Sequence, residues 1–217
     1  MAKIALKAAL AGRAFLAIPL ALALSFSLAA PGPLWGAEEF SLPGPVRRDL
    51  IALAKEPLTA AVAGREVRVP RPNKALDPAF PMVVSLYLNG LLAARAWNLE
   101  SPGPMSQTAL ALGAQVLVDP SLGRVLEAEE LPLATVGVAI IRDLAEARDD
   151  RDLRPGMAAI VFSGLTVSVG LPSDAPPPKT AQDLLNLTCE LAGLRPTAWL
   201  GGQSTILTGL TAETLEK

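Results

Sequence analysis

The sequence predicts an α+β fold, in which a mostly antiparallel sheet built from hairpins packs against several helices. Strand-like runs occur in pairs around short turn signals, over residues 80–97 and again over 157–171. Apolar residues follow helical spacing in three other stretches, 46–63, 104–118 and 180–193. Because hairpins outnumber strand–helix–strand units, the pattern favours α+β over α/β.

The first predicted element is a surface helix over residues 46–63. Leu50, Leu53 and Leu58 lie at roughly helical spacing, and Gly64 is a typical stop signal. Pro57 falls inside the pattern and predicts a kink there. Residues 65–79 are then expected to form a loop region with room for one short strand.

A hairpin and a second helix are predicted next. Residues 80–88 alternate in hydrophobicity, and Asn89-Gly90 separates them from a second apolar run over 91–97. Asn-Gly between two such runs is the strongest short signal for a hairpin, because both residues tolerate positive φ. The helix over 104–118 places its apolar residues on one face and ends at Asp119-Pro120.

The remaining elements are a strand, a hairpin and a helix. Residues 132–141 are rich in β-branched side chains and predict a strand, which a charged stretch follows over 142–154. Apolar runs at 157–162 and 165–171 predict a hairpin around Ser163-Gly164. Thr180 and Asp183 are spaced as a capping box for the last helix, which Gly193 closes.

The first 37 residues predict an export signal. Lys3, Lys7 and Arg13 precede an uncharged apolar stretch over 14–30, and Gly36-Ala37 offers small residues for cleavage. An uncleaved membrane anchor is the alternative, and it would be the only contact with a membrane. The predicted organisation is a signal at 1–37, one domain at 45–200 and a C-terminal tail at 201–217. The expected location is the periplasm or cell envelope.

Composition narrows the chemistry further. The chain has no histidine and one cysteine, Cys189, so the commonest catalytic bases, nucleophiles and transition-metal ligands are missing or single. We therefore predict no catalytic residue, no metal site and no cofactor. Without the signal, 16 basic residues face 21 acidic ones, a net charge of −5. That balance argues against nucleic acid as a partner, since phosphate binding needs clustered basic residues.

Three stretches together resemble the AMMECR domain family. They are VSLYLNGLLAARAWNLE at 84–100, LRPGMAAIVFSGLTVSVGLPSDA at 153–175 and TAQDLLNLTCELAGLRPTAW at 180–199. The resemblance implies a single AMMECR-like domain over 45–200. It also implies Memo-like or radical-SAM proteins as partners, because family members often occur beside them in the cytosol, whereas the export signal points to another compartment.

The chain departs from the family pattern at two places. Family members typically carry Arg-Gly-Cys-Ile-Gly on the second strand of the first hairpin, where this chain has Ala93-Ala94-Arg95-Ala96-Trp97. They usually follow Leu-Pro with Gln-Val, where this chain has Ser173-Asp174. Any family activity that depends on the signature cysteine is therefore not expected here.

These departures favour an exported, non-catalytic binding or scaffold module for a protein or small ligand. The candidate binding residues are Arg95, Trp97, Glu100, Ser173 and Asp174. Arg95 would pair with an anionic group and Trp97 would offer a flat apolar contact. Their spacing by two residues predicts that both point to the same side of a strand. The alternative places Trp97 in the core and Arg95 on a solvated face.

Two other functions fit the sequence. An enzyme would use carboxylates or Arg95 in a cleft, with Glu100, Asp119 and Asp174 as candidate acids or bases. A structural protein of the envelope would instead show an apolar surface patch and self-association. A pocket that collects two of the carboxylates would favour the enzyme.

Overall fold

The structure is a computed structural model that describes residues 41–69, 73–100, 103–122 and 126–216. The predicted export signal at 1–37 lies outside the described residues. Within the described ranges, no helix combines the length and apolar composition that a membrane span requires.

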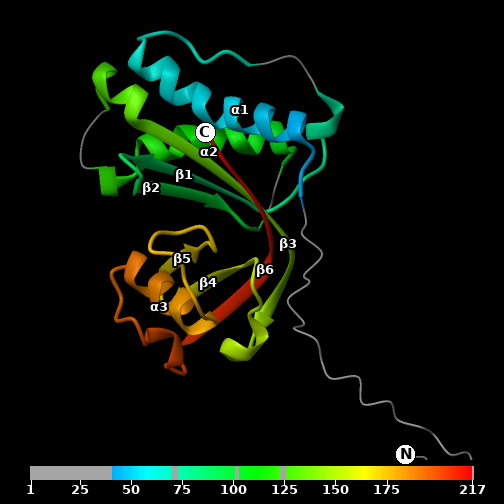
Figure 1. The fold of residues 1–217 in the computed structure, drawn as a ribbon, viewed down its shortest axis with the longest axis vertical. Helices are drawn as coiled ribbons and strands as arrows, with labels where there is room; N and C mark the ends of the chain where they lie inside the picture. Colours follow the sequence, from blue (N-terminus) through cyan, green and yellow to red (C-terminus); the bar gives the residue numbers. More distant parts are fainter. Residues whose placement is uncertain (1–40, 70–72, 101–102, 123–125, 217) are drawn as a thin grey trace, which may run out of the picture. The chain divides into compact units, whose positions relative to one another are not determined.

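In the described ranges, nine longer elements make up the fold (Figure 1). In chain order they are α1 (Gly44–Val62), β1 (Met82–Leu88), β2 (Leu91–Asn98), α2 (Met105–Leu117), β3 (Ala134–Ala147), β4 (Met157–Ser163), β5 (Thr166–Gly170), α3 (Ala181–Leu191) and β6 (Ser204–Leu215). The six strands form one sheet in the order β2-β1-β3-β6-β4-β5, and every neighbouring pair is antiparallel. The predicted α+β class with an antiparallel sheet is confirmed.

The β1–β2 hairpin turns at Asn89-Gly90, as predicted. Asn89 has φ 53° and Gly90 has φ 78°, so both central residues occupy the left-handed region that a tight hairpin turn requires. The register then shifts by one residue. Tyr87 pairs with Leu92 whereas Leu86 pairs with Ala94, which leaves Ala93 as an extra residue in β2. This β-bulge decides which side chains of β2 face which side of the sheet.

The stretch that we expected to be a C-terminal tail, 201–217, instead contains β6. This strand lies in the middle of the sheet, between β3 and β4. Its buried positions include Ile206, Thr208 and Ala212, which alternate with less buried ones. Threonine and alanine on the buried face hide the apolar alternation that identifies a strand, although threonine itself has high strand propensity.

The helices cover one face of the sheet, which we call the outer face. One cluster of buried side chains fills the space between α1, α2 and strands β1 to β3, with Leu50, Leu112 and Val138 among them. A second cluster lies under α3 and includes Val161, Cys189 and Ile206. Figure 1 shows α1 and α2 over one half of the sheet and α3 beside β4 and β5.

A third cluster fills the opposite, inner face of the sheet. Its fully buried members are Val83, Ala139, Ile141, Ala158, Ile160, Val169 and Leu171. Val83 comes from β1 and Val169 from β5, which are four positions apart in the strand order. Arg95 on β2, the first strand of the order, donates a hydrogen bond to the carbonyl of Val169 on β5, the last strand, so the sheet curls until its two edges meet over this inner face.

Helix α3 lies unusually close to the edge strand β5. A Cβ atom added at Gly170 would overlap the Thr188 hydroxyl. That hydroxyl donates a hydrogen bond to the Leu184 carbonyl, 2.7 Å away within the helix. Glycine at this position therefore permits the close approach that seats α3 against β5.

Candidate functional site

The bulge in β2 places Arg95 and Trp97 on the inner face of the sheet. In the observed register Arg95 lies opposite Ser85, and Trp97 lies opposite Val83, which belongs to the inner-face cluster. Both side chains thus share one face, as their spacing predicts. The alternative of a solvated Arg95 beside a buried Trp97 does not hold, because Arg95 is buried and Trp97 is half-buried.

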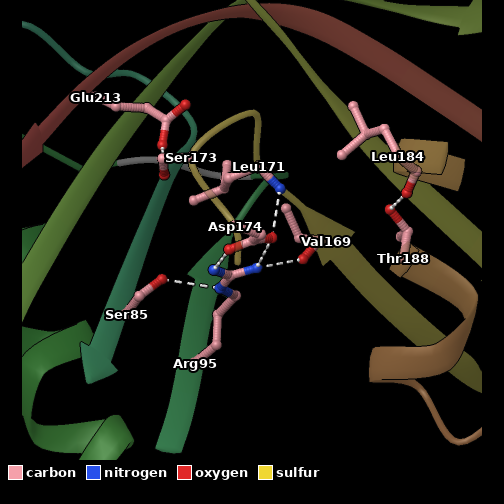
Figure 2. Close-up of polar contacts among 9 residues, drawn as sticks. All are labelled: Ser85, Arg95, Val169, Leu171, Ser173, Asp174, Leu184, Thr188 and Glu213. Atoms are coloured by element: carbon pink, nitrogen blue, oxygen red, sulfur yellow. Dashed lines mark hydrogen bonds and ion pairs between the residues drawn. The ribbon is translucent and has the colours of Figure 1, made fainter. Parts of the chain in front are cut away.

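Arg95 is bonded on all sides within the protein (Figure 2). Its guanidinium forms a bidentate ion pair with Asp174, in which Nη1 donates to Oδ2 over 2.9 Å and Nη2 donates to Oδ1. Nε donates to the Ser85 hydroxyl over 2.8 Å, and Nη1 also donates to the Val169 carbonyl over 2.7 Å. Asp174 Oδ2 in turn accepts the Leu171 backbone N–H over 2.8 Å.

The ion pair is almost completely removed from solvent. Arg95 is 7% exposed and Asp174 is 3% exposed. Burial opposes the charged guanidinium, but the hydrogen bond and the negative charge of Asp174 outweigh it and raise the pKa of Arg95. Among the described residues, no buried side-chain nitrogen or oxygen lacks a hydrogen-bond partner. The pair therefore meets the condition under which buried charges are tolerated.

Arg95 also joins the two edges of the sheet. It belongs to β2, the first strand in the sheet order, and Val169 belongs to β5, the last. The hydrogen bond to the Val169 carbonyl and the ion pair to Asp174, just beyond β5, hold these edges together across the inner face. Two of the predicted binding residues, Arg95 and Asp174, thus bind each other.

Ser173 forms a second polar contact next to this pair. Its hydroxyl donates to Glu213 Oε2 on β6, as Figure 2 shows. Burial raises the pKa of Glu213, and the charge of Asp174 acts in the same direction, while the Ser173 hydrogen bond and Arg95 oppose it. Sequence reasoning selected Ser173 but missed two partners. Ser85 was missed because the strand register across the bulge cannot be counted from the turn alone, and Glu213 because its strand, β6, was expected to be a tail.

Trp97 and Glu100 line an open cleft of about 480 Å³, which we call the Trp97 cleft. Its walls come from β2 and the residues after it, from α2, and from the β4–β5 hairpin. The lining residues are Trp97, Asn98, Leu99, Glu100, Gly103, Gln107, Thr108, Ala111, Leu112, Gln115, Phe162 and Val167. The volume is within the range of small-molecule sites, roughly 300–1,000 Å³.

The polar wall of the cleft comes from one side of α2. Gln107, Ala111 and Gln115 are spaced by four residues and are all exposed, so they form a stripe along the helix. The sequence contained this signal, since the two glutamines flank the apolar face that packs on the sheet. It could not show that Phe162 and Val167, from a distant hairpin, complete the cleft.

A larger groove lies between α2, α1 and residues 67–69 and 73–77, and it shares Gln107 and Ala111 with the Trp97 cleft. It measures about 910 Å³, and its surface is mostly apolar, with Leu53, Val69 and Leu110 among the lining residues. None of the five candidate binding residues lines it. The Trp97 cleft is therefore the hollow to which the sequence prediction applies.

The three carboxylates considered for an enzyme do not meet in one pocket. Glu100 lines the Trp97 cleft, and Asp174 is held by Arg95. Asp119 accepts hydrogen bonds from the backbone and hydroxyl of Ser121 at 2.8 and 2.6 Å. In the part of the chain that the structure describes, no three acidic or cysteine side chains are grouped to hold a metal ion.

Cys189 is fully buried between α3 and the sheet, in the same cluster as Leu185 and Trp199. Burial raises the pKa of its thiol, which disfavours the reactive thiolate. The single cysteine of the chain therefore packs as a small apolar residue in α3.

A similar fold occurs in a protein of known structure. The crystal structure of the uncharacterised protein PH0010 from Pyrococcus horikoshii is similar, with a TM-score of 0.63 and 20% sequence identity. The similarity covers 77% of this chain and 90% of that one. No family model matches this chain, and no curated protein matches it. At this identity the likeness concerns the fold alone.

Proposed function

We propose that this chain is an exported, AMMECR-like binding module that holds a ligand in the Trp97 cleft and performs no catalysis. One observation carries the proposal: the candidate residues divide into two groups. Arg95 and Asp174 neutralise each other in the interior, while Trp97 and Glu100 line an open cleft. The paired charges of Arg95 and Asp174 are therefore inaccessible to a ligand, whereas the aromatic surface of Trp97 is accessible.

The family assignment draws support from the placement of the three resembling stretches. They form the β1–β2 hairpin, the β4–β5 hairpin and α3. The two sites where the chain departs from the family pattern, 93–97 and 173–174, meet in the Arg95–Asp174 ion pair. We infer that the two departures compensate each other, because each supplies one partner of the same buried pair.

The chemistry of the cleft suits recognition better than catalysis. Half-buried Trp97 and Phe162 offer aromatic surface, and side-chain amides from α2 offer donors and acceptors at the rim. Small-molecule sites commonly combine apolar and aromatic walls with a few placed polar groups.

The test is purification from the envelope fraction of the native cells after mild crosslinking, followed by mass spectrometry. The expected N-terminus lies near Glu38, and a stoichiometric ligand or partner should accompany the chain. A Trp97→Leu variant should lose it, whereas Leu200→Ala, which changes an exposed apolar side chain outside the cleft, should retain it.

Two results would contradict the proposal. An intact Met1 start in the mature protein would remove the argument for cleavage and soluble export. A ligand that stays bound at full stoichiometry to the folded Trp97→Leu variant would move the binding site away from the cleft.

A further inference from the structure

The Trp97 cleft has an unbalanced charge. Glu100 is exposed and, among the residues that the structure describes, is the only charged residue in the lining. The other polar lining groups are neutral, namely the side chains of Asn98, Gln107, Thr108 and Gln115. Arg95 lies two residues before Trp97 on β2, but its charge is neutralised by Asp174 inside the protein. The cleft therefore presents negative charge beside an aromatic wall.

We propose that the Trp97 cleft binds an organic cation, an ammonium or guanidinium group, between the Trp97 indole and the Glu100 carboxylate. This inference rests on the proposed binding function and names its ligand class. Cations are attracted to the negative face of an aromatic ring, and tryptophan is the strongest such partner. The negative charge of a glutamate carboxylate at neutral pH also attracts a cation.

The same features disfavour other ligand classes. An anion would meet the Glu100 carboxylate, and no basic residue among the described lining residues would offset that repulsion. An inorganic divalent cation would find one carboxylate, too few charged oxygen ligands for a calcium or magnesium site. A neutral ligand would use the amides of Gln107 and Gln115 but would gain nothing from Glu100.

Two sources of this chemistry have to be separated, namely a free small amine and the basic side chain of a peptide. Three probes do so: agmatine, the tripeptide amide Gly-Arg-Gly, and the same tripeptide with citrulline in place of arginine. Citrulline keeps the size and planarity of the arginine head group but carries no charge. Equal binding of agmatine and the arginine peptide assigns the site to the free cation, and tighter peptide binding assigns it to a basic segment.

Trp97 itself supplies the signal for these titrations. The chain has three tryptophans, and removal of residues 1–37 would leave Trp97 and Trp199. Trp199 is 8% exposed and its indole N–H donates to Asn186 over 2.9 Å, so it gives a constant background. Tryptophan fluorescence of the envelope-purified protein, or NMR of its indole N–H groups, then reports occupancy of the cleft.

The expected result is binding of both cationic probes, with the citrulline peptide at least about fivefold weaker. Glu100→Gln should lower the affinity for the cationic probes by about three- to fivefold, as the loss of an exposed charge pair does. The affinity for the citrulline peptide should not change. Added salt should weaken cation binding through screening. The matched control is Glu190→Gln, the same change at an exposed position of α3 outside the cleft, which should leave all affinities unchanged.

Three outcomes overturn the inference: equal binding of the citrulline and arginine peptides, unchanged affinity in Glu100→Gln, or no binding of any cation by the folded protein. None of them alone removes the proposed function. If the native ligand from the crosslinking experiment still requires Trp97, the chain remains a binding module with a neutral or anionic ligand. If that ligand does not require Trp97, the proposed function fails as well.

Discussion

Arg95 and Trp97 lie two residues apart on the same face of β2, yet their surroundings are opposite. Arg95 is enclosed by Ser85, Val169 and Asp174, so its charge stabilises the contact between the two edges of the sheet. Trp97 lines an open cleft beside Glu100. The difference teaches that the residue with the stronger chemistry in a sequence is not necessarily the one offered to a ligand.

The largest expected effect comes from breaking the buried ion pair with Asp174→Asn. The change keeps the size of the side chain but leaves the Arg95 charge uncompensated in the interior, which costs about 3–5 kcal/mol of unfolding free energy. Urea unfolding followed by circular dichroism measures it. A loss below about 1 kcal/mol would mean that water reaches Arg95 and that the two regions are less different than the structure shows.

A double-mutant cycle isolates the interaction itself. Arg95→Met and Asp174→Asn should each destabilise the protein, but the double variant should be about 1–3 kcal/mol more stable than their sum predicts, because no unpaired charge remains. The Val169 carbonyl still loses its donor, so the double variant stays below the native protein. Additive losses in the cycle would show that the two side chains act independently.

The sequence predicted most of the fold because its signals are local. Asn89-Gly90 specified the first hairpin, and Thr180 with Asp183 specified the start of α3, where both capping hydrogen bonds are present. Strand β6 escaped prediction, since its position between β3 and β4 depends on partners far away in the sequence. Local propensity carries no information about such pairing.

The arrangement of the five candidate residues could not be predicted from the sequence. Arg95, Trp97, Glu100, Ser173 and Asp174 were selected from departures in a family pattern. Their division into a buried pair and a cleft depends on the extra residue at Ala93. A straight register counted from the turn would have put Ala94 opposite Ser85 and turned Arg95 to the other face. Nothing in the run Leu91 to Ala94 signals a bulge.

Glu213 next to the ion pair should make stability depend on pH. Its pKa is raised in the folded state, mainly by burial, so folding favours the protonated carboxyl. At pH values below its ordinary pKa, about 4.3, both states are protonated and no penalty exists. As the pH rises through that value the unfolded chain ionises first, and the folded state loses stability until Glu213 ionises too.

Glu213→Gln should therefore be more stable than the native protein at neutral pH, and this advantage should shrink as the pH falls toward about 4. Glutamine can still accept the Ser173 hydroxyl, so the comparison isolates the charge. Urea unfolding of both proteins between pH 4 and 7 measures the difference. An advantage that is the same at every pH would show that Glu213 has the same pKa in the folded and unfolded states.

Glu100→Gln replaces a carboxylate by an amide, as Asp174→Asn does, but at an exposed position in the Trp97 cleft. Its effect on stability should be the smallest of these variants. Glu100 is exposed, and substitutions at such positions usually change the unfolding free energy by less than about 0.5 kcal/mol. The variant should unfold at the same urea concentration as the native protein while it loses affinity for cations. If it were destabilised by more than about 1 kcal/mol, Glu100 would be serving the fold, and its charge would not be available to a ligand in the Trp97 cleft.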